Sequence, residues 1–271
     1  MGLGLVAYDL TYFVLASALY GSAAWVAARA FLIAERYVPW PFLLVAGGAI
    51  FLVTLIAEVG VLTLFVPRLK TGRSALMRGA NFYVWMVRSL LRRILFAPGL
   101  KWFLFTSNTL RFLTLRALGA KVAFSANMSS DVDILDPSLL VVGPRAVIGA
   151  RSLVSGHYVE GGVLILGTVT IGEKAMIAAD VTIGPGATIG EGATCQVRAA
   201  VGPNAVLGKG ARLGGDSGLD VNVQVGAGAD IGVRCYLARG VKVPDGTRIP
   251  ALTHLPSPPR EQKTEQMPAD S

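Results

Sequence analysis

The stretch "TIGEKAMIAADVTIGPGATIG", residues 170–190, decides the fold because its aliphatic residues recur every six positions. The recurring residues of this stretch are Ile171, Ile177, Ile183 and Ile189. A period of six differs from the 3.6 of an α-helix and from the alternation of a free strand, and it is typical of one flat face of a parallel β-helix. The stretch therefore predicts an all-β solenoid built from hexapeptide repeats.

The same six-residue frame continues to the end of the repeat region. Its later aliphatic positions are Val201, Leu207, Leu213, Leu219, Val225, Ile231, Leu237, Val243 and Ile249. Only Cys195 interrupts the series, and the residue four places after each anchor is small or β-branched. Small residues suit stacked coils, which leave little interior volume. Glycine often follows the anchor, as at Gly172 and Gly190, and we interpret it as the residue that lets the backbone turn at a corner.

The repeat breaks within "LVSGHYVEGGVLIL", residues 153–166. An earlier frame passes through Val142, Ile148 and Val154, and the later frame resumes at Ile165, one residue too early for the same phase. A chain that leaves its coil and returns in a new phase forms a loop or a bulge, and such departures often carry function. His157 lies inside this break, and we therefore expect it on a loop.

His157 is the main candidate for a catalytic residue, because an imidazole titrates near neutrality and accepts a proton from an alcohol or an amine. Glu160 is expected either to orient that imidazole or to bind a cationic acceptor, and Tyr158 is expected to contact the substrate. Asp216, in "LGGDSGLD", is expected to line a donor groove or to form a simple turn corner. The alternative for His157 is a solvated loop residue without a role.

The remaining histidine and the two cysteines predict no metal site. His254 lies in a polar, proline-rich segment that has too little apolar content to pack. Cys195 and Cys235 stand at inward repeat positions, far apart and without neighbouring histidine or cysteine, so they lack the spacing of a zinc site. We interpret both as small core residues.

The first quarter of the chain has a different composition. Hydrophobic residues make up 53% of the 271-residue chain and the mean hydropathy is +0.56. Two long apolar stretches, one ending before Glu35 and one ending at Pro67, explain these values. Each exceeds the roughly 20 residues that cross a bilayer, and no Lys or Arg precedes the first as in a signal peptide. Asp9 and Glu58 lie in or near these stretches, where a carboxylate is costly and often functional. The alternative is that Asp9 reaches the membrane interface and that Glu58 forms a hydrogen bond between helices.

The formal net charge of +8 arises from the segment after the second apolar stretch. Residues 59–130 contain eleven Lys and Arg and no acidic residue. By the positive-inside rule this segment and the N-terminus are cytoplasmic. Arginines interleaved with aromatic and leucine residues are typical of helices at the lipid headgroup boundary, which favours a membrane over a nucleic acid as the partner.

The repeat over residues 140–250 resembles the left-handed β-helix of the hexapeptide-repeat acyltransferases. The resemblance implies three hexads per coil, a homotrimer with active sites at subunit boundaries, and a loop histidine that acts as general base while the acceptor attacks an acyl thioester. The donor would then be acyl-CoA or a phosphopantetheine-bound acyl thioester. Carbonic anhydrases of this fold bind zinc through three histidines, whereas this chain has only two.

The layout of the whole chain resembles one unit of the C-terminal region of the poly-lysine-synthetase type of nonribosomal peptide synthetase. The similarity lies in the two apolar spans, "NTLRFLTLRALGAKV", "DVDILDPSLLVVG" and the "GH" followed by an acidic residue. It implies a carrier protein or an adenylating enzyme as a partner, and an assembly of three separate chains, because this chain carries one unit where that family has three in tandem.

Four regions follow from these patterns. We expect two transmembrane helices over residues 1–67, basic amphipathic connector helices over 68–125, a left-handed β-helix over 126–252 and a disordered tail over 253–271. The expected function is that of an inner-membrane acyltransferase whose β-helix and termini face the cytoplasm, and which transfers an acyl or aminoacyl group to an amine or a hydroxyl. The alternative is a non-catalytic trimeric membrane scaffold.

Overall fold

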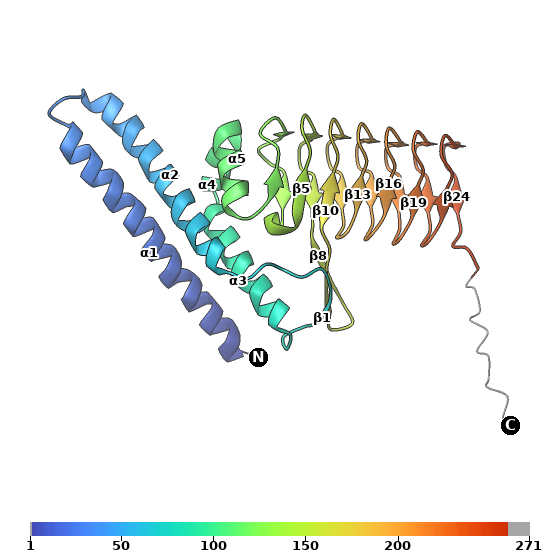
Figure 1. The fold of residues 1–271 in the computed structure, drawn as a ribbon, viewed down its shortest axis with the longest axis horizontal. Coiled ribbons are helices and arrows are strands. Elements are labelled where there is room, and N and C mark those ends of the chain that lie inside the picture. Colours follow the sequence, from blue (N-terminus) through green and yellow to red (C-terminus); the bar gives the residue numbers. More distant parts are fainter. Residues whose placement is uncertain (1, 260–271) are drawn as a thin grey trace.

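The computed structural model describes residues 2–259, which form a helical unit followed by a long β-helix (Figure 1). The helices of the first unit are α1 (Gly2–Ala34), α2 (Trp40–Phe65), α3 (Ala80–Leu95), α4 (Leu100–Thr106) and α5 (Asn108–Ala117). Helices α1 and α2 form a hairpin, and by length and composition both are able to cross a membrane. The structure confirms the expected fold class of apolar N-terminal helices followed by a left-handed parallel β-helix.

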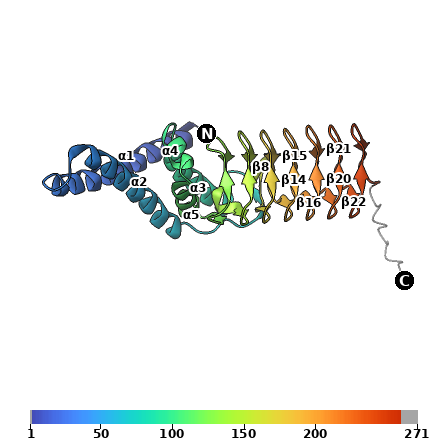
Figure 2. The ribbon, with the colours of Figure 1, turned by 90° about the horizontal axis from the view of Figure 1, so that it is seen from above.

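The β-helix consists of three seven-stranded parallel sheets, one for each face of the prism (Figure 2). Sheet I contains β2 (Lys121–Val122), β5 (Leu140–Val142), β10 (Val169–Ile171), β13 (Thr188–Ile189), β16 (Val206–Leu207), β19 (Gln224–Val225) and β22 (Lys242–Val243). Sheet II contains β3 (Asn127–Met128), β6 (Val147–Ile148), β11 (Met176–Ile177), β14 (Thr194–Cys195), β17 (Arg212–Leu213), β20 (Asp230–Ile231) and β23 (Arg248–Ile249). Sheet III contains β4 (Asp133–Ile134), β7 (Leu153–Val154), β12 (Thr182–Ile183), β15 (Ala200–Val201), β18 (Gly218–Leu219), β21 (Tyr236–Leu237) and β24 (His254–Leu255).

The hexad anchors stack on one another inside the prism. Ile171 pairs in register with Ile189, and Ile189 pairs with Leu207, so each aliphatic residue covers the one in the coil below. The small inward residues are equally buried, as shown by Ala187 and Ala205, both fully inaccessible to solvent. The interior is therefore filled by one large and one small side chain per hexad.

The glycines that follow the anchors have a different role from the one expected. A Cβ built on Gly190 would lie 2.6 Å from the carbonyl carbon of Gly208 in the next coil, and one on Gly172 would lie 2.7 Å from the backbone nitrogen of Glu191. These glycines permit close stacking of successive coils. The turn itself uses the left-handed region two residues further on, where Gly186 has a φ of +75° and Asn204 a φ of 55°.

The helical unit and the β-helix share one hydrophobic core. Leu90 and Ile94 of α3 are buried in the same cluster as Leu55 of α2 and the first coils of the β-helix. The buried Arg111 of α5 donates a hydrogen bond of 2.7 Å to the carbonyl oxygen of Met128 in the first coil. The connector helices thus pack against both neighbours and cover the open end of the β-helix.

The boundaries differ slightly from those expected. The β-helix begins with β2 at Lys121, before the expected start at residue 126, and its last strand is β24. His254 belongs to this strand, where Tyr236 pairs with it, so it lies in the β-helix and not in the tail.

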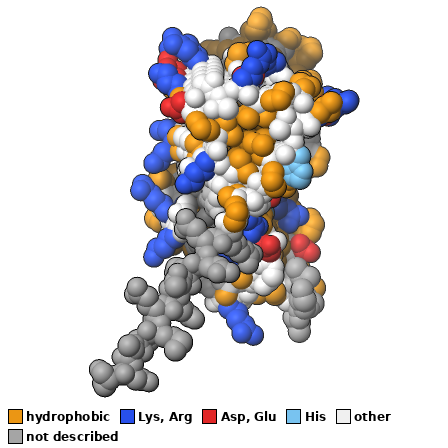
Figure 3. All heavy atoms as spheres, turned by 90° about the vertical axis from the view of Figure 1, so that its right-hand side faces the viewer, with side chains coloured by type: hydrophobic (Ala, Val, Ile, Leu, Met, Phe, Trp, Pro, Cys, Tyr) orange, Lys and Arg blue, Asp and Glu red, His pale blue; other side chains and the backbone are white. Residues whose placement is uncertain are grey.

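In Figure 3, which looks onto this end of the molecule, hydrophobic side chains lie on the end face and several Lys and Arg side chains lie around the rim. Residues 260–271 of the expected tail lie outside the described residues.

Glu58 faces a groove between α1 and α2 that also includes Ser22 and Thr54. One carboxylate oxygen of Glu58 is buried and has no hydrogen-bond partner among residues 2–259. The expected hydrogen bond from Glu58 to the neighbouring helix is therefore not formed within the described part of the chain.

The neighbouring residues Ala199 and Ala200 provide a test of the packing. Ala199 points inward with 1% exposure, whereas Ala200 points outward from sheet III. Ala199→Leu should lower the free energy of unfolding by about 3 kcal/mol, because the stacked interior has no space for the added atoms. Ala200→Leu should change it by less than about 0.5 kcal/mol. Chemical denaturation of the purified proteins measures both, and equal effects would contradict this account of the interior.

Candidate active site

The break in the repeat forms a small antiparallel sheet. The chain leaves the β-helix after β7 and returns at β10, and between them β8 (His157–Glu160) and β9 (Val163–Leu166) form a hairpin. A third strand, β1 (Gly72–Ala75) from the connection between α2 and α3, pairs with β9. The break is thus an ordered sheet instead of a loop, and Ile165 lies in this sheet instead of resuming the hexads, which restart in β10.

The preceding coil also departs from the hexapeptide pattern, at the position next to the hairpin. One coil earlier, the same edge between sheets III and I holds a 3-10 helix, η1 (Pro137–Leu139), in place of the usual turn. Asp136 precedes this helix. Gly156, just before the hairpin, lies so close that an added Cβ would come 3.0 Å from the Cβ of Asp136. The two departures are stacked, and this stacking brings Asp136 to His157.

Asp136 and His157 form a dyad. Nδ1 of His157 lies 2.6 Å from Oδ2 of Asp136, and the backbone N–H of Gly156 donates to the same oxygen at 2.9 Å. Nε1 of Trp85 donates to Oδ1 at 2.8 Å. Asp136 is only 6% exposed, so these three contacts satisfy a carboxylate that water scarcely reaches.

The helical unit supplies one wall of this site. The indole of Trp85, from α3, lies against the imidazole of His157 with the ring centroids 4.8 Å apart. Phe82, also from α3, forms a buried cluster with Leu164 and Leu166 of the hairpin. The sheet that carries His157 is therefore packed against a helix that is itself fixed to α1 and α2.

This arrangement prepares the imidazole for proton transfer. A carboxylate that accepts a hydrogen bond from Nδ1 fixes the tautomer in which Nε2 carries the free lone pair. The side chain of His157 retains 21% exposure, so a reactant is able to approach it. A histidine held by a carboxylate in this way is able to accept a proton from a reactant.

The two faces of the hairpin differ in character. Because neighbouring residues of a strand point to opposite faces, His157 faces α3, whereas Tyr158 and Glu160 face the other way. There they line a cavity of about 600 Å³ together with Arg73 and Arg239. Glu160 accepts a long hydrogen bond, 3.5 Å, from the hydroxyl of Tyr158. The carboxylate that orients His157 is thus Asp136, which corrects the first of the two roles expected for Glu160.

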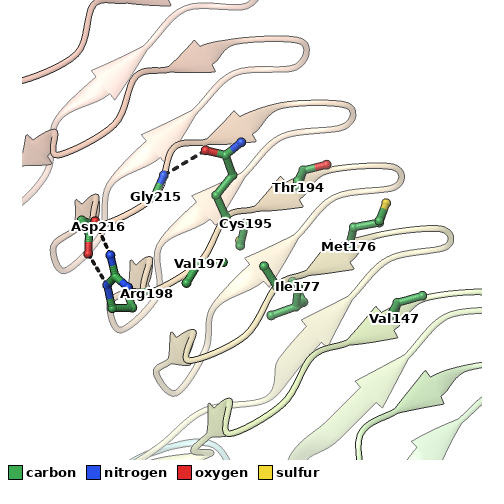
Figure 4. Close-up of a pocket in the computed structure, with 11 residues that line it drawn as sticks. Val147, Met176, Ile177, Thr194, Cys195, Val197, Arg198, Gly215 and Asp216 are labelled. Atoms are coloured by element: carbon green, nitrogen blue, oxygen red, sulfur yellow. Dashed lines mark hydrogen bonds and ion pairs between the residues drawn. The ribbon is translucent and has the colours of Figure 1, made fainter.

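Asp216 lies on a different edge of the prism from His157. It follows β17 and precedes β18, between sheets II and III, and it forms a two-pronged ion pair with Arg198 at 2.6 and 2.9 Å (Figure 4). The guanidinium of Arg198 lowers the pKa of Asp216 below its usual value. Both residues line a shallow cavity of about 390 Å³ that also includes Met176. Within one chain, Asp216 therefore does not join the site around His157.

The cysteines are core residues, as expected. Burial raises the pKa of Cys195 to about 12, so its thiol stays protonated and unreactive at neutral pH. Among the described residues, no group of three His, Cys, Asp or Glu side chains is placed to hold a metal ion.

Asp136 and Trp85 were not identified from the sequence. A signal for Asp136 was present, because the interval between Ile134 and Val142 is longer than six residues and marks a second slip of the repeat. For Trp85 there was no such signal, since it lies on a helix distant in sequence and its contact depends on how α3 packs on the hairpin.

Similarity to known proteins was found among solved structures. No protein-family model matches the sequence, and no curated protein matches it. The chain is similar to a solved hexapeptide transferase family protein from Anaplasma phagocytophilum, with 18% identity and a TM-score of 0.36, covering 46% of this chain and 73% of that one.

Two further solved structures bear the same kind of similarity. PerB from Caulobacter crescentus, in complex with CoA and GDP-perosamine, has 20% identity and a TM-score of 0.29, and the match covers 52% of this chain and 59% of PerB. The acetyltransferase domain of PglB from Neisseria gonorrhoeae, in complex with acetyl coenzyme A, has 21% identity and a TM-score of 0.23, covering 54% of this chain and 63% of that domain. The chain thus spans less than two thirds of these two proteins, and the similarity concerns the β-helix fold.

The hydrogen bond from Trp85 to Asp136 generates a prediction about stability. Trp85→Phe keeps an aromatic ring but leaves a buried carboxylate oxygen without its donor, so it should lower the free energy of unfolding by about 1–3 kcal/mol. Trp102→Phe is the matched control, because Trp102 is 61% exposed and its replacement should cost less than about 0.5 kcal/mol. Thermal unfolding in detergent measures both, and an unchanged Trp85→Phe protein would contradict the described contact.

Proposed function

We propose that this protein is a membrane-anchored acyltransferase in which His157 acts as the general base. The observation that carries the proposal is the dyad of His157 and the buried Asp136, formed where the hexapeptide-type β-helix meets a helical unit that includes two helices able to cross a membrane. We further propose that the donor is acyl-CoA or a phosphopantetheine-bound acyl thioester. The PglB complex with acetyl coenzyme A and the PerB complex with CoA support the first of these.

The proposed reaction uses one proton relay. Nε2 of His157 takes the proton from the acceptor hydroxyl or amine while the acceptor oxygen or nitrogen attacks the thioester carbonyl carbon. Asp136 stabilises the imidazolium that forms, because its carboxylate lies 2.6 Å from Nδ1. The C–S bond of the adduct then breaks and the thiolate takes the proton from Nε2, which leaves an ester or amide, a free thiol and neutral His157.

The cavity on the other face of the hairpin is a second part of this proposal. Tyr158 and Glu160 line it with Arg73 and Arg239, so it offers one negative and two positive side chains to a polar substrate. We assign Tyr158 and Glu160 to substrate binding. A role for Asp216 in donor binding stays a prediction, and it requires a neighbouring subunit, since Asp216 lies on another edge of the same chain.

The proposed assembly is a homotrimer in an inner membrane, with both chain ends and the β-helix in the cytoplasm. The basic residues that follow α2 support this orientation. A narrower version uses an aminoacyl thioester supplied by a carrier protein and an adenylating enzyme, as the resemblance to poly-lysine synthetases implies. Assays with acyl-CoA and with an aminoacyl-carrier protein as donor distinguish the general acyltransferase from this narrower version.

The competing function is that of a non-catalytic scaffold. A hairpin used only as a structural brace would gain nothing from a buried carboxylate, whose desolvation is unfavourable. The partial exposure of the His157 side chain likewise has no structural use. The dyad therefore favours the enzyme.

Replacing the proposed base tests this function directly. His157→Gln should lower the rate of thioester consumption by about 10² to 10⁴, the usual contribution of a positioned general base. His254→Gln is the control and should retain the full rate, because His254 lies in the last strand of the β-helix. Thiol release from a panel of acyl-CoA donors measures both variants. Equal rates for His157→Gln and the unmodified protein would refute the proposed base.

The orienting carboxylate has its own test. Asp136→Asn keeps the shape of the side chain, but its amide is able to hold the imidazole in the opposite tautomer, so kcat should fall by about 10² or more. The KM for the donor should stay the same, because Asp136 contacts the histidine and not the substrate. A variant that raises KM while it leaves kcat unchanged would assign Asp136 to substrate binding instead.

A further inference from the structure

We propose that the acceptor is a lipid-anchored molecule with an anionic polar head, which reaches His157 along α3 from the membrane surface. This inference rests on the proposed acyltransferase function and adds the class of acceptor. It follows from the side of the hairpin on which His157 lies, from the level of the membrane on the helices, and from the charge of the segment that joins α2 to the hairpin and to α3.

His157 faces α3 of the helical unit and not the length of the β-helix. Its imidazole contacts Trp85 of α3, and the same face of the hairpin packs on Phe82 through Leu164 and Leu166. The other end of α3 is buried against the α1–α2 hairpin through residues such as Ile94. A single helix thus connects the dyad with the segment that enters the bilayer.

Aromatic residues mark the level of the membrane on α1. The 33 residues of this helix measure about 50 Å, whereas the hydrocarbon core of a bilayer is about 30 Å thick, so one part of α1 lies outside the core. Tyr8 and Tyr12 form an interfacial pair with Arg93, whose guanidinium carbon lies 5.7 and 4.9 Å from their ring centroids. From Tyr12 to the turn that contains the exposed Tyr37, the helix covers about 33 Å, which matches the core.

This placement brings the dyad close to the lipid headgroups. Arg93 lies in the last turn of α3, and Trp85 lies two turns earlier on the same helix, so about 12 Å of helix separates them. The length of a polar head is therefore sufficient to bring a hydroxyl or amine from the membrane surface to His157. A soluble acceptor would gain nothing from this proximity.

The connection from α2 to the hairpin is held in place. Arg88 of α3 donates hydrogen bonds to the carbonyl oxygens of Val66 and Pro67, at 2.8 and 3.0 Å, just after α2 ends. The side chain of Asn81 bonds to both the N–H and the carbonyl of Lys70. The dyad and the membrane helices therefore keep a fixed separation.

The segment that joins α2 to the hairpin and to α3 suits an anionic head group. Arg68, Lys70 and Arg78 are exposed in this segment, and the chain has no acidic residue between Glu58 and Asp131. Clustered Lys and Arg residues close to a membrane attract anionic lipid headgroups.

The test compares matched lipid and soluble acceptors. The full chain in lipid nanodiscs is given radiolabelled acyl-CoA with phosphatidylserine or phosphatidylglycerol in the bilayer, or with phosphoserine or glycerol 3-phosphate in solution. We expect label in the organic extract that depends on His157 and exceeds, by at least tenfold, the label transferred to the soluble head groups. Label in the soluble acceptors alone would overturn the lipid inference and leave the acyltransferase intact. No His157-dependent transfer to any acceptor would overturn both.

A charge variant tests the path to the dyad. Arg68→Gln combined with Lys70→Gln should lower lipid labelling at least about fivefold, because each basic residue contributes to the attraction of an anionic headgroup. Lys242→Gln is the control and should label lipids normally, since Lys242 is exposed near the far end of the β-helix. Equal labelling by the double variant and the control would contradict a role of Arg68 and Lys70 in attracting the lipid acceptor.

Discussion

The close stacking of successive coils is the constraint on which the rest of the structure depends. A Cβ on Gly190 would meet the backbone of the next coil at 2.6 Å, so a coil that departs from the pattern has no room to do so inside the stack. Any inserted segment has to leave at an edge of the prism. Two consecutive coils depart at the same edge, and the stacking that holds the coils in register also holds Asp136 against His157.

The helical unit turns this local contact into a fixed site. Trp85 donates to the oxygen of Asp136 that His157 does not occupy, and β1 extends the hairpin from the other side. Both come from the segment between α2 and α5. The dyad therefore lies at a junction of three parts of the chain, the early coils, the hairpin and the helical unit, and none of these parts forms it alone.

The sequence predicts the fold well because the hexad pattern is a local rule. Each anchor such as Ile171 is recognised from its neighbours six residues away, and the structure places these anchors inside the prism. The corner glycines show a limit of that reasoning. Their residue type was recognised, but the reason for it, contact with the next coil, depends on residues about three hexads away in the sequence.

The candidate site was predictable only in part, and strand geometry explains why. The phase slip identified the departure that carries His157, but "HYVE" was interpreted as a loop whose side chains converge. In a strand, adjacent side chains point to opposite faces, so Tyr158 and Glu160 turn away from the imidazole. Asp136, the partner of His157, comes from the preceding coil. The phase slip around His157 does not reveal that the preceding coil departs at the same edge.

The proposed function also explains why two helices able to cross a membrane are joined to a β-helix in one chain. A tether alone would require only a flexible linker, yet Arg88 fixes the end of α2 and Arg111 fixes α5 to the first coil. In the proposed enzyme, these fixed connections hold the site at one height above the bilayer. Because Trp85 holds Asp136 from the helical side, a tilt of α3 would move the orienting carboxylate away from His157. The packing of the helical unit therefore determines both where the site lies and whether its histidine is correctly oriented.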